Sequence, residues 1–223
     1  MLKLSKFTLE VLKNFASINP NLVVQEGSRL TTIAEAKNIF AVATVPEKFD
    51  QVFGIYDLND FLANYNLLDD PEISFNGETA LLTSDRTSIK YRFANPSVLT
   101  SPSKDVKMPD TDITVTLTSD HLGKIRKAAG VMGHSVLALQ GDDDGSLTLK
   151  VLDPKDPSSN VYSISLDASH KLEKKFSLEF LIDNLKLLPG EYTVSISSKL
   201  ISQWVHNEFA ITYFVALEKT SAI

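Results

Sequence analysis

The sequence predicts an α+β protein with two similar domains, each with two helices packed on antiparallel sheets. Three observations support this fold class. Short β-rich runs alternate with turn residues along most of the chain, a segment rich in proline and serine interrupts them near the middle, and the order of elements then repeats. With 223 residues, the chain is long enough for two domains of ordinary size.

The first predicted element is an amphipathic helix over residues 4–19. Side chains at helical spacing form its apolar face: Leu9, Leu12, Phe15 and Ala16. The opposite face is polar: Lys6, Glu10, Lys13 and Asn14. Either Ser5 or Thr8 can cap the start, because a hydroxyl oxygen accepts a hydrogen bond from the first free amides.

Four short strands are predicted next, over residues 22–25, 30–33, 38–44 and 49–56. A second helix follows, with Asp57 as its cap and an apolar face made of Leu58, Phe61, Leu62, Tyr65 and Leu68. Three more strands are predicted over residues 73–75, 80–82 and 89–92, with Asn76-Gly77 as a hairpin turn. The first domain is therefore predicted to cover residues 1–94.

Residues 95–112 are predicted to form an extended connector between the domains, because they contain Pro96, Pro102 and Pro109 among several serines. Val98 and Leu99 are apolar within it, and the plain structural expectation is that they pin the connector to the domain beneath.

The second domain, residues 113–223, repeats the order of the first. A strand is predicted over 113–117 and a helix over 119–129, with Leu122, Ile125 and Ala129 on its apolar side. A hairpin is predicted across Asp142–Gly145, because a strand follows where a calcium loop needs ligands. Apolar residues at helical spacing predict a second helix: Leu178, Leu181, Ile182 and Leu185. These two helices align with the two of the first domain, which indicates an internal repeat.

Composition and motifs exclude several classes of function. The chain has no cysteine, and its four histidines are not at the spacing of metal ligands. No nucleotide-binding glycine loop and no nucleophile elbow is present. No apolar run approaches the roughly 20 residues that span a bilayer, and no secretory signal is recognisable. We therefore expect no cofactor, no metal, no membrane partner and no catalytic residues.

Basic residues gather on the first helix of each predicted domain: Lys3, Lys6 and Lys13 in one, and Lys124, Arg126 and Lys127 in the other. For a single helix, a solvated face would explain such residues. Two equivalent helices with the same bias instead favour contact with phosphates, without reading of bases. The net charge of −6 argues against a uniformly basic surface but permits a single basic face.

The chain resembles the DNA polymerase sliding clamps of T-even-type bacteriophages. The similarity is strongest in an opening block, Leu4-Ser5-Lys6 with residues 12–19, and it is weak over residues 25–49 and 96–112. Further segments carry it: Tyr56-Asp57-Leu58-Asn59, Phe61-Leu62, Glu72-Ile73-Ser74, Pro189-Gly190-Glu191-Tyr192 and residues 213–218. The tail over residues 219–223 departs from the acidic and aromatic ending of that family.

This resemblance implies the DNA-clamp fold and a closed homotrimeric ring whose six domains place helices around a central hole. It also implies a protein without catalytic activity in the cytoplasm of an infected bacterium. The implied partners are double-stranded DNA within the ring, the replicative DNA polymerase and an ATP-dependent clamp loader. Partner peptides would bind an apolar pocket beside the connector. By analogy and apolar placement alone, we expect its residues to be Val98, Leu99, Met108, Val215 and Leu217.

Two other hypotheses remain open at this point. The chain could be an interaction or scaffold module that has the internal repeat but forms no ring, or an enzyme whose site the motifs do not reveal. The repeat favours the two binding functions over the enzyme, and the opening block favours the clamp over the scaffold.

Overall fold

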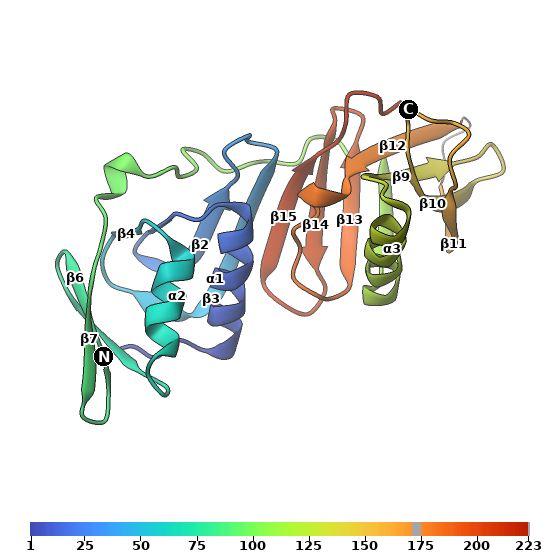
Figure 1. Cartoon of the computed structure of the whole chain (residues 1–223). Coiled ribbons are helices and arrows are strands. Elements are labelled where there is room, and N and C mark those ends of the chain that lie inside the picture. The colour runs from blue at the N-terminus through green and yellow to red at the C-terminus, as the bar shows by residue number, and fades with distance from the viewer. Residues whose placement is uncertain (171–174, 223) are drawn as a thin grey trace. The chain divides into compact units, whose positions relative to one another are not determined.

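The computed structural model describes residues 1–170 and 175–222 and divides the chain into two units. Unit 1 comprises Met1–Asp105 with the short piece Ala210–Thr212. Unit 2 comprises Val106–Phe209 and the residues from Tyr213 onward. In each unit, antiparallel strands have helical segments packed on one face (Figure 1).

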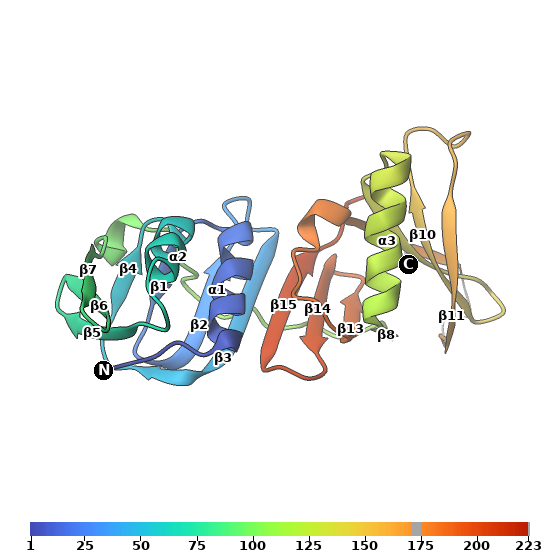
Figure 2. The same ribbon diagram turned by 60° about the horizontal axis from the view of Figure 1, so that its bottom comes forward.

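Unit 1 contains two α-helices, α1 (Lys6–Ile18) and α2 (Leu58–Asn66), which lie side by side (Figure 2). Its strands are β1 (Leu22–Val24), β2 (Gly27–Ile33), β3 (Ile39–Phe49), β4 (Phe53–Ile55), β5 (Glu72–Asn76), β6 (Thr79–Ser84) and β7 (Thr87–Arg92). The pairs β1–β4 and β2–β3 are antiparallel, and β5, β6 and β7 form a three-stranded sheet. The 3-10 turn η1 (Pro96–Val98) begins the connector.

Helix α1 begins after Ser5, whose hydroxyl accepts a hydrogen bond from the Thr8 amide at 3.2 Å. Ser5 is thus the cap, one of the two candidates in the sequence. The buried face consists of Thr8, Val11, Leu12, Phe15 and Ile18. Compared with the predicted face it is rotated toward Val11 and Ile18, and Leu9 and Ala16 are only half-buried at its border.

Helix α2 has the predicted cap and the predicted core face. One carboxylate oxygen of Asp57 accepts hydrogen bonds from the amides of Asn59 and Asp60. Leu58, which is fully buried, leads the apolar stripe that packs inward. Because α1 and α2 bury their stripes on the same side, both helices leave a polar face toward solvent.

Unit 2 contains one α-helix among its described residues, α3 (Ser119–Met132). Its strands are β8 (Ile113–Leu117), β9 (Val136–Gly141), β10 (Ser146–Leu152), β11 (Tyr162–Ser169), β12 (Phe176–Leu181), β13 (Tyr192–Ser197), β14 (Ile201–His206) and β15 (Ile211–Ala216). They form a sheet in the order β11-β10-β9-β12, and β15-β14-β13-β8 follow one another in a second sheet. The predicted hairpin across Asp142–Gly145 joins β9 to β10, as expected.

Helix α3 has strong signals at both ends. Thr118 and His121 form a reciprocal capping box, in which each side chain accepts a hydrogen bond from the other residue's amide. At the other end, Gly133 adopts a φ of 70°, which a residue without a Cβ accommodates easily. The helix therefore continues past Ala129, where the prediction ended it.

The prediction of a helix over Leu178–Leu185 is wrong. This stretch is the end of β12 followed by a 3-10 turn, η2 (Ile182–Asn184). Phe176, Leu178 and Phe180 alternate with half-buried residues, so the period is two, and Phe180 stacks edge-on against Trp204. The prediction used four apolar positions at helical spacing and left out Phe176 and Phe180, which lie two residues on either side of Leu178 and show the strand period. The expectation of two helices in each domain thus fails in unit 2.

Candidate nucleic-acid interface

The outward face of α1 carries four exposed or half-exposed positions in one line. Lys6, Glu10, Lys13 and Ser17 follow the spacing of 3.6 residues per turn, so they point the same way, away from the buried stripe. Seven residues separate the two lysines, which places their Cα atoms about 10 Å apart at 1.5 Å per residue. Neither lysine makes an ion pair with another described residue.

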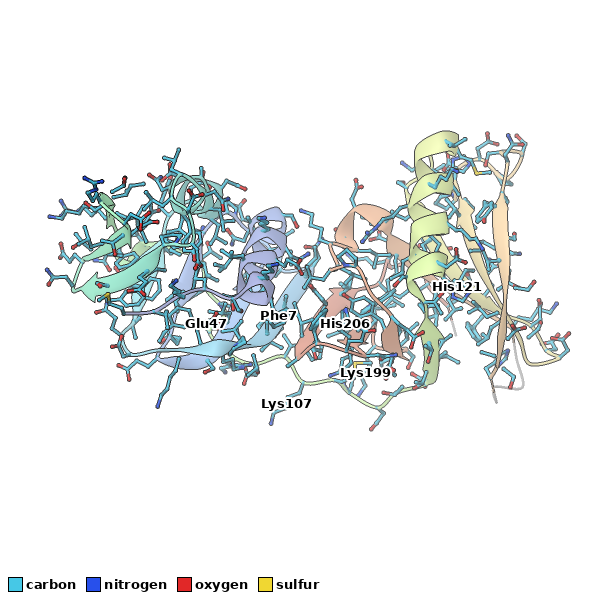
Figure 3. The ribbon with its side chains drawn as sticks, turned by 90° about the horizontal axis from the view of Figure 1, so that it is seen from below. Phe7, Glu47, Lys107, His121, Lys199 and His206 are labelled. Atoms are coloured by element: carbon cyan, nitrogen blue, oxygen red, sulfur yellow. The ribbon has the colours of Figure 1, made fainter. Side chains whose placement is uncertain are left out.

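Glu47 on β3 holds the start of α1 in place. Its carboxylate accepts hydrogen bonds from the backbone N–H of Ser5 and from the hydroxyl of Thr8. Glu47 is only 7% exposed and has no cationic partner among the described residues. Figure 3 shows it beside the first turn of α1, which carries Phe7. A strand residue thus completes the cap of the helix that presents Lys6 and Lys13.

On α3, Asp120, Lys124, Lys127 and Val131 form one line of exposed residues at the same helical spacing. The ammonium of Lys124 lies 2.6 Å from the Asp120 carboxylate, and this hydrogen-bonded ion pair raises the pKa of Lys124. Lys127 has no such partner within the part of the chain that the structure describes.

Arg126 lies away from this line. Its guanidinium donates to the carbonyl oxygens of Leu185 and Leu187 at 3.0 and 3.4 Å, which ties α3 to the segment after η2. Sequence reasoning missed this contact because it placed a helix over that segment.

Lys3 precedes α1, and its ammonium lies 2.7 Å from the Asp70 carboxylate. That hydrogen bond raises the pKa of Lys3. Of the six basic residues singled out in the sequence, Lys6, Lys13 and Lys127 therefore remain without an acidic or carbonyl partner among the described residues. Their role toward DNA stays a prediction.

The five predicted pocket residues fall in different places. Val98 is 73% exposed in η1, and Leu99 packs so closely on Gly54 that a Cβ there would lie 2.7 Å from Leu99 Cδ1. Both belong to unit 1, where Leu99 anchors the connector. Met108, Val215 and Leu217 belong to unit 2, and the last two are buried in its core. The pocket also stays a prediction.

The connector lies beside β2 in unit 1. Arg29 on β2 and Asp105 in the connector form an ion pair at 2.6 Å. A groove of about 400 Å³ lies there, with mainly polar lining: Val23, Gln25, Arg29, Thr31, Ser101, Pro102, Ser103, Lys104 and Asp105. The described residues contain no cluster of three or more side chains that could hold a metal ion. No helix among them has the length and apolar character needed to cross a membrane.

Comparisons with known proteins identify the family. A family model described as DNA polymerase processivity factor matches residues 3–100. The sliding clamp of Vibrio phage KVP40 is 30% identical over 222 residues, which cover 97% of this chain and 99% of that protein. The chain belongs to the sliding clamps of T-even-type bacteriophages. The clamp of Enterobacteria phage T4 is 27% identical and covers 89% of this chain.

Solved structures agree on the clamp fold. PCNA from Thermococcus kodakaraensis superposes with a TM-score of 0.69 at 15% identity, with 96% of each chain covered. PCNA from A. fulgidus, solved with the C-terminal region of FEN-1 bound, gives a TM-score of 0.72 at 10% identity, with 99% of this chain and 98% of that one covered. The clamp fold of this chain thus has one α-helix and a 3-10 turn among the described residues of unit 2.

Proposed function

We propose that three copies of this clamp close into a ring around duplex DNA and tether the replicative polymerase to its template. The observation that supports this most directly is the position of the lysines. The first helix of each unit, α1 and α3, buries an apolar stripe and leaves a face with lysines opposite to it. A protein with a net charge of −6 thereby offers DNA two local basic faces.

We assign DNA-facing positions to Lys3, Lys6, Lys13, Lys124, Arg126 and Lys127, with the main attraction from Lys6, Lys13 and Lys127. Lys3 and Lys124 already bind carboxylates, which reduces their field at a distance. Attraction of this kind acts on phosphates irrespective of sequence and weakens with salt, so it permits sliding. Encirclement, not affinity, would keep the ring on DNA.

We propose residues 1–94 and 113–223 as the two clamp domains, with 95–112 as the connector between them. A partner peptide would bind beside the connector, with Val98, Leu99, Met108, Val215 and Leu217 contributing to an apolar pocket. The polymerase and an ATP-driven clamp loader are the expected users of this site. The clamp itself would catalyse no reaction and would act in the cytoplasm of the infected bacterium.

A processivity assay tests the function. The matching polymerase and loader extend a primer on singly primed circular DNA, with and without this protein. We expect long products only when the clamp is present, and a loss of the effect after linearisation, because a ring slides off free ends. Equal product lengths with and without the protein on circular DNA would contradict the proposal.

Leu99→Asp tests the pocket in the same assay. A charge in an apolar contact is costly, so we expect weaker polymerase stimulation. Val52→Asp is a matched control, because Val52 is also apolar and 44% exposed but lies outside the proposed pocket. Unchanged stimulation by a folded Leu99→Asp protein would remove Leu99 from the partner site.

A further inference from the structure

Residues 218–222, which we call the strap, lie along the outer edge of β12 in unit 2. Strand β12 ends the sheet β11-β10-β9-β12, and no further strand of the described chain pairs with its far side. The peptide groups of Ser177 and Glu179 point to that side, because those of the alternate residues face β9. The strap supplies the hydrogen bonds that a neighbouring strand would otherwise make.

The strap is an imperfect strand. Ala222 and Ser177 exchange two backbone hydrogen bonds, with N···O distances of 2.8 and 2.9 Å. Next along β12, the Glu218 amide donates to the Glu179 carbonyl oxygen at 2.8 Å, but the Glu179 amide donates to the hydroxyl of Ser221. Between these contacts the strap turns, since the Ser221 amide donates to the Glu218 carbonyl oxygen. A side chain therefore replaces the backbone acceptor that a straight strand would provide.

Hydrogen bonds, with little apolar burial, hold the strap on the sheet. Lys219, Thr220 and Ala222 are exposed, whereas Leu217 just before the strap is buried. The Thr220 hydroxyl adds a hydrogen bond to the Glu179 carboxylate at 2.5 Å. Segments with few buried apolar contacts open locally at a low cost in free energy. The strap can therefore leave the edge of β12 while the core of unit 2 stays folded.

An open strap exposes an edge that fits an extended segment of another protein. The freed N–H and C=O groups of Ser177 and Glu179 have the spacing of a β-ladder, and such an edge can take up a strand from a second chain. The Glu179 side chain is half-exposed and makes no ion pair among the described residues. A residue of opposite charge directly across from it would stabilise the pairing. The edge therefore favours a segment with a lysine or arginine facing Glu179.

We infer that the outer edge of β12 is a second docking site, which takes an extended basic segment of a partner protein in exchange for the strap. The incoming strand would pair with the backbone of Ser177 and Glu179 without the detour through the Ser221 hydroxyl. The closed strap competes with it, so the apparent affinity falls with the fraction of molecules in which the strap is open. The site does not depend on ring closure, because all its residues belong to unit 2 of one copy.

Hydrogen exchange followed by NMR measures the opening of the strap. We expect the amides of Ser177 and Glu179 to have protection factors at least about tenfold lower than those of Leu178 and Phe180, whose amides face β9. The difference arises because the first pair is released with the strap and the second pair only with the sheet. Equal protection along β12 would show that the strap does not open by itself, and it would overturn the exchange.

A peptide measures the docking directly. Ser221→Ala with Ala222→Pro removes a hydroxyl acceptor and an amide donor from the strap and so loosens it. A blocked fluorescent peptide, Thr-Val-Lys-Val-Thr, should bind this variant at least about tenfold more tightly than the natural chain, because the edge is free more often. Fluorescence anisotropy measures both affinities, and circular dichroism checks the fold of the variant.

The control peptide has the same sequence with methyl groups on the amide nitrogens that face β12. It keeps the side chains but cannot form the ladder, so we expect its binding to be lost. Three results would overturn strand exchange: no binding of the plain peptide to the loosened variant, equal affinity for the variant and the natural chain, or undiminished binding of the methylated peptide.

Charge reversal in the loosened variant tests the role of Glu179. With Glu179→Lys, a peptide with glutamate at its centre should bind more tightly than the lysine peptide. Asp183→Lys is the matched control, because Asp183 is also acidic and exposed but lies in η2, beyond the end of β12. A preference for the lysine peptide that survives Glu179→Lys, or that Asp183→Lys reverses equally, would overturn selection by Glu179.

Discussion

Arg126 shows how a single side chain can have a role that its charge alone does not indicate. In the sequence it stands between Lys124 and Lys127 and reads as part of a basic face. In the structure its guanidinium donates to two carbonyl groups near η2, and its position on the helix differs from that of the lysines by more than a quarter turn. Its contribution to stability should therefore exceed its contribution to DNA binding.

Replacing Arg126 tests this assignment. We expect Arg126→Ala to lower the free energy of unfolding by about 1–3 kcal/mol, because hydrogen bonds to a charged group are lost and the carbonyls of Leu185 and Leu187 are left less satisfied. Arg126→Lys should recover little of the loss, since a lysine lacks the planar fork. Urea denaturation measures both. A stable Arg126→Ala protein with weakened DNA retention would indicate a phosphate contact instead.

The contribution of Glu47 to the stability of the fold can also be tested with a single substitution. In Glu47→Ala, the Ser5 amide and the Thr8 hydroxyl lose their buried acceptor, and we expect a cost of about 1–3 kcal/mol. Glu35→Ala is the matched control, because Glu35 is exposed near the β2–β3 turn. Thermal unfolding followed by circular dichroism measures the difference. Equal midpoints for the two variants would show that the Glu47 contacts add nothing to stability.

At the scale of elements, sequence periodicity predicted α1, α2 and α3 because each has an apolar stripe at helical spacing, and caps were recognisable in the sequence for α1 and α2. It failed over residues 178–185 because the helical spacing of four apolar residues was followed and the alternation of Phe176, Leu178 and Phe180 was left out. The packing partners of this segment identify it as a strand, since Phe176 and Phe180 pack into a sheet. The basic faces of α1 and α3 could be predicted from the helical spacing of their lysines. The Asp120–Lys124 ion pair follows from the same spacing, because the two residues are one helical turn apart. The Glu47 contact could not be predicted, because it joins residues 39 and 42 positions apart.

The lysine face of α1 carries a prediction about salt. Lys6→Glu with Lys13→Glu should weaken retention of the loaded clamp on circular DNA and reduce the dependence on salt by up to about two counterions, while stability changes by less than about 0.5 kcal/mol. Lys48→Glu is the control, because Lys48 is exposed on the sheet face opposite to the buried positions of β3. An identical effect of Lys48→Glu would attribute the loss to net charge alone.

At the scale of the whole molecule, buried tyrosines limit stability in alkali. Burial raises the pKa of Tyr192 and of Tyr213 above the ordinary range, and it raises the pKa of Tyr91 to about 12. Tyr192 also donates to the carbonyl oxygen of Leu188 at 2.7 Å, which only the neutral phenol can do. Folded clamp therefore keeps these protons at a pH where the unfolded chain has lost them.

We accordingly expect the free energy of unfolding to fall as pH rises above about 10, where an unperturbed tyrosine ionises. Each of the two fully buried tyrosines adds a slope of up to about 1.4 kcal/mol per pH unit. Urea unfolding at several pH values between about 9 and 12, which brackets the ordinary tyrosine pKa of about 10, measures this. Tyr213→Phe should flatten the slope, and a free energy independent of pH across this range would contradict the expectation.

Trp204 is an intrinsic fluorescence probe that reports on one unit of the molecule. It is the chain's single tryptophan, it is completely buried on β14, and its indole N–H donates to Ser202, whose hydroxyl donates in turn to the Val215 carbonyl. Its fluorescence therefore records the interior of unit 2. A Trp204 emission change at a lower urea concentration than the main loss of far-ultraviolet circular dichroism, which reports both units, would reveal that unit 2 unfolds separately, without any label added.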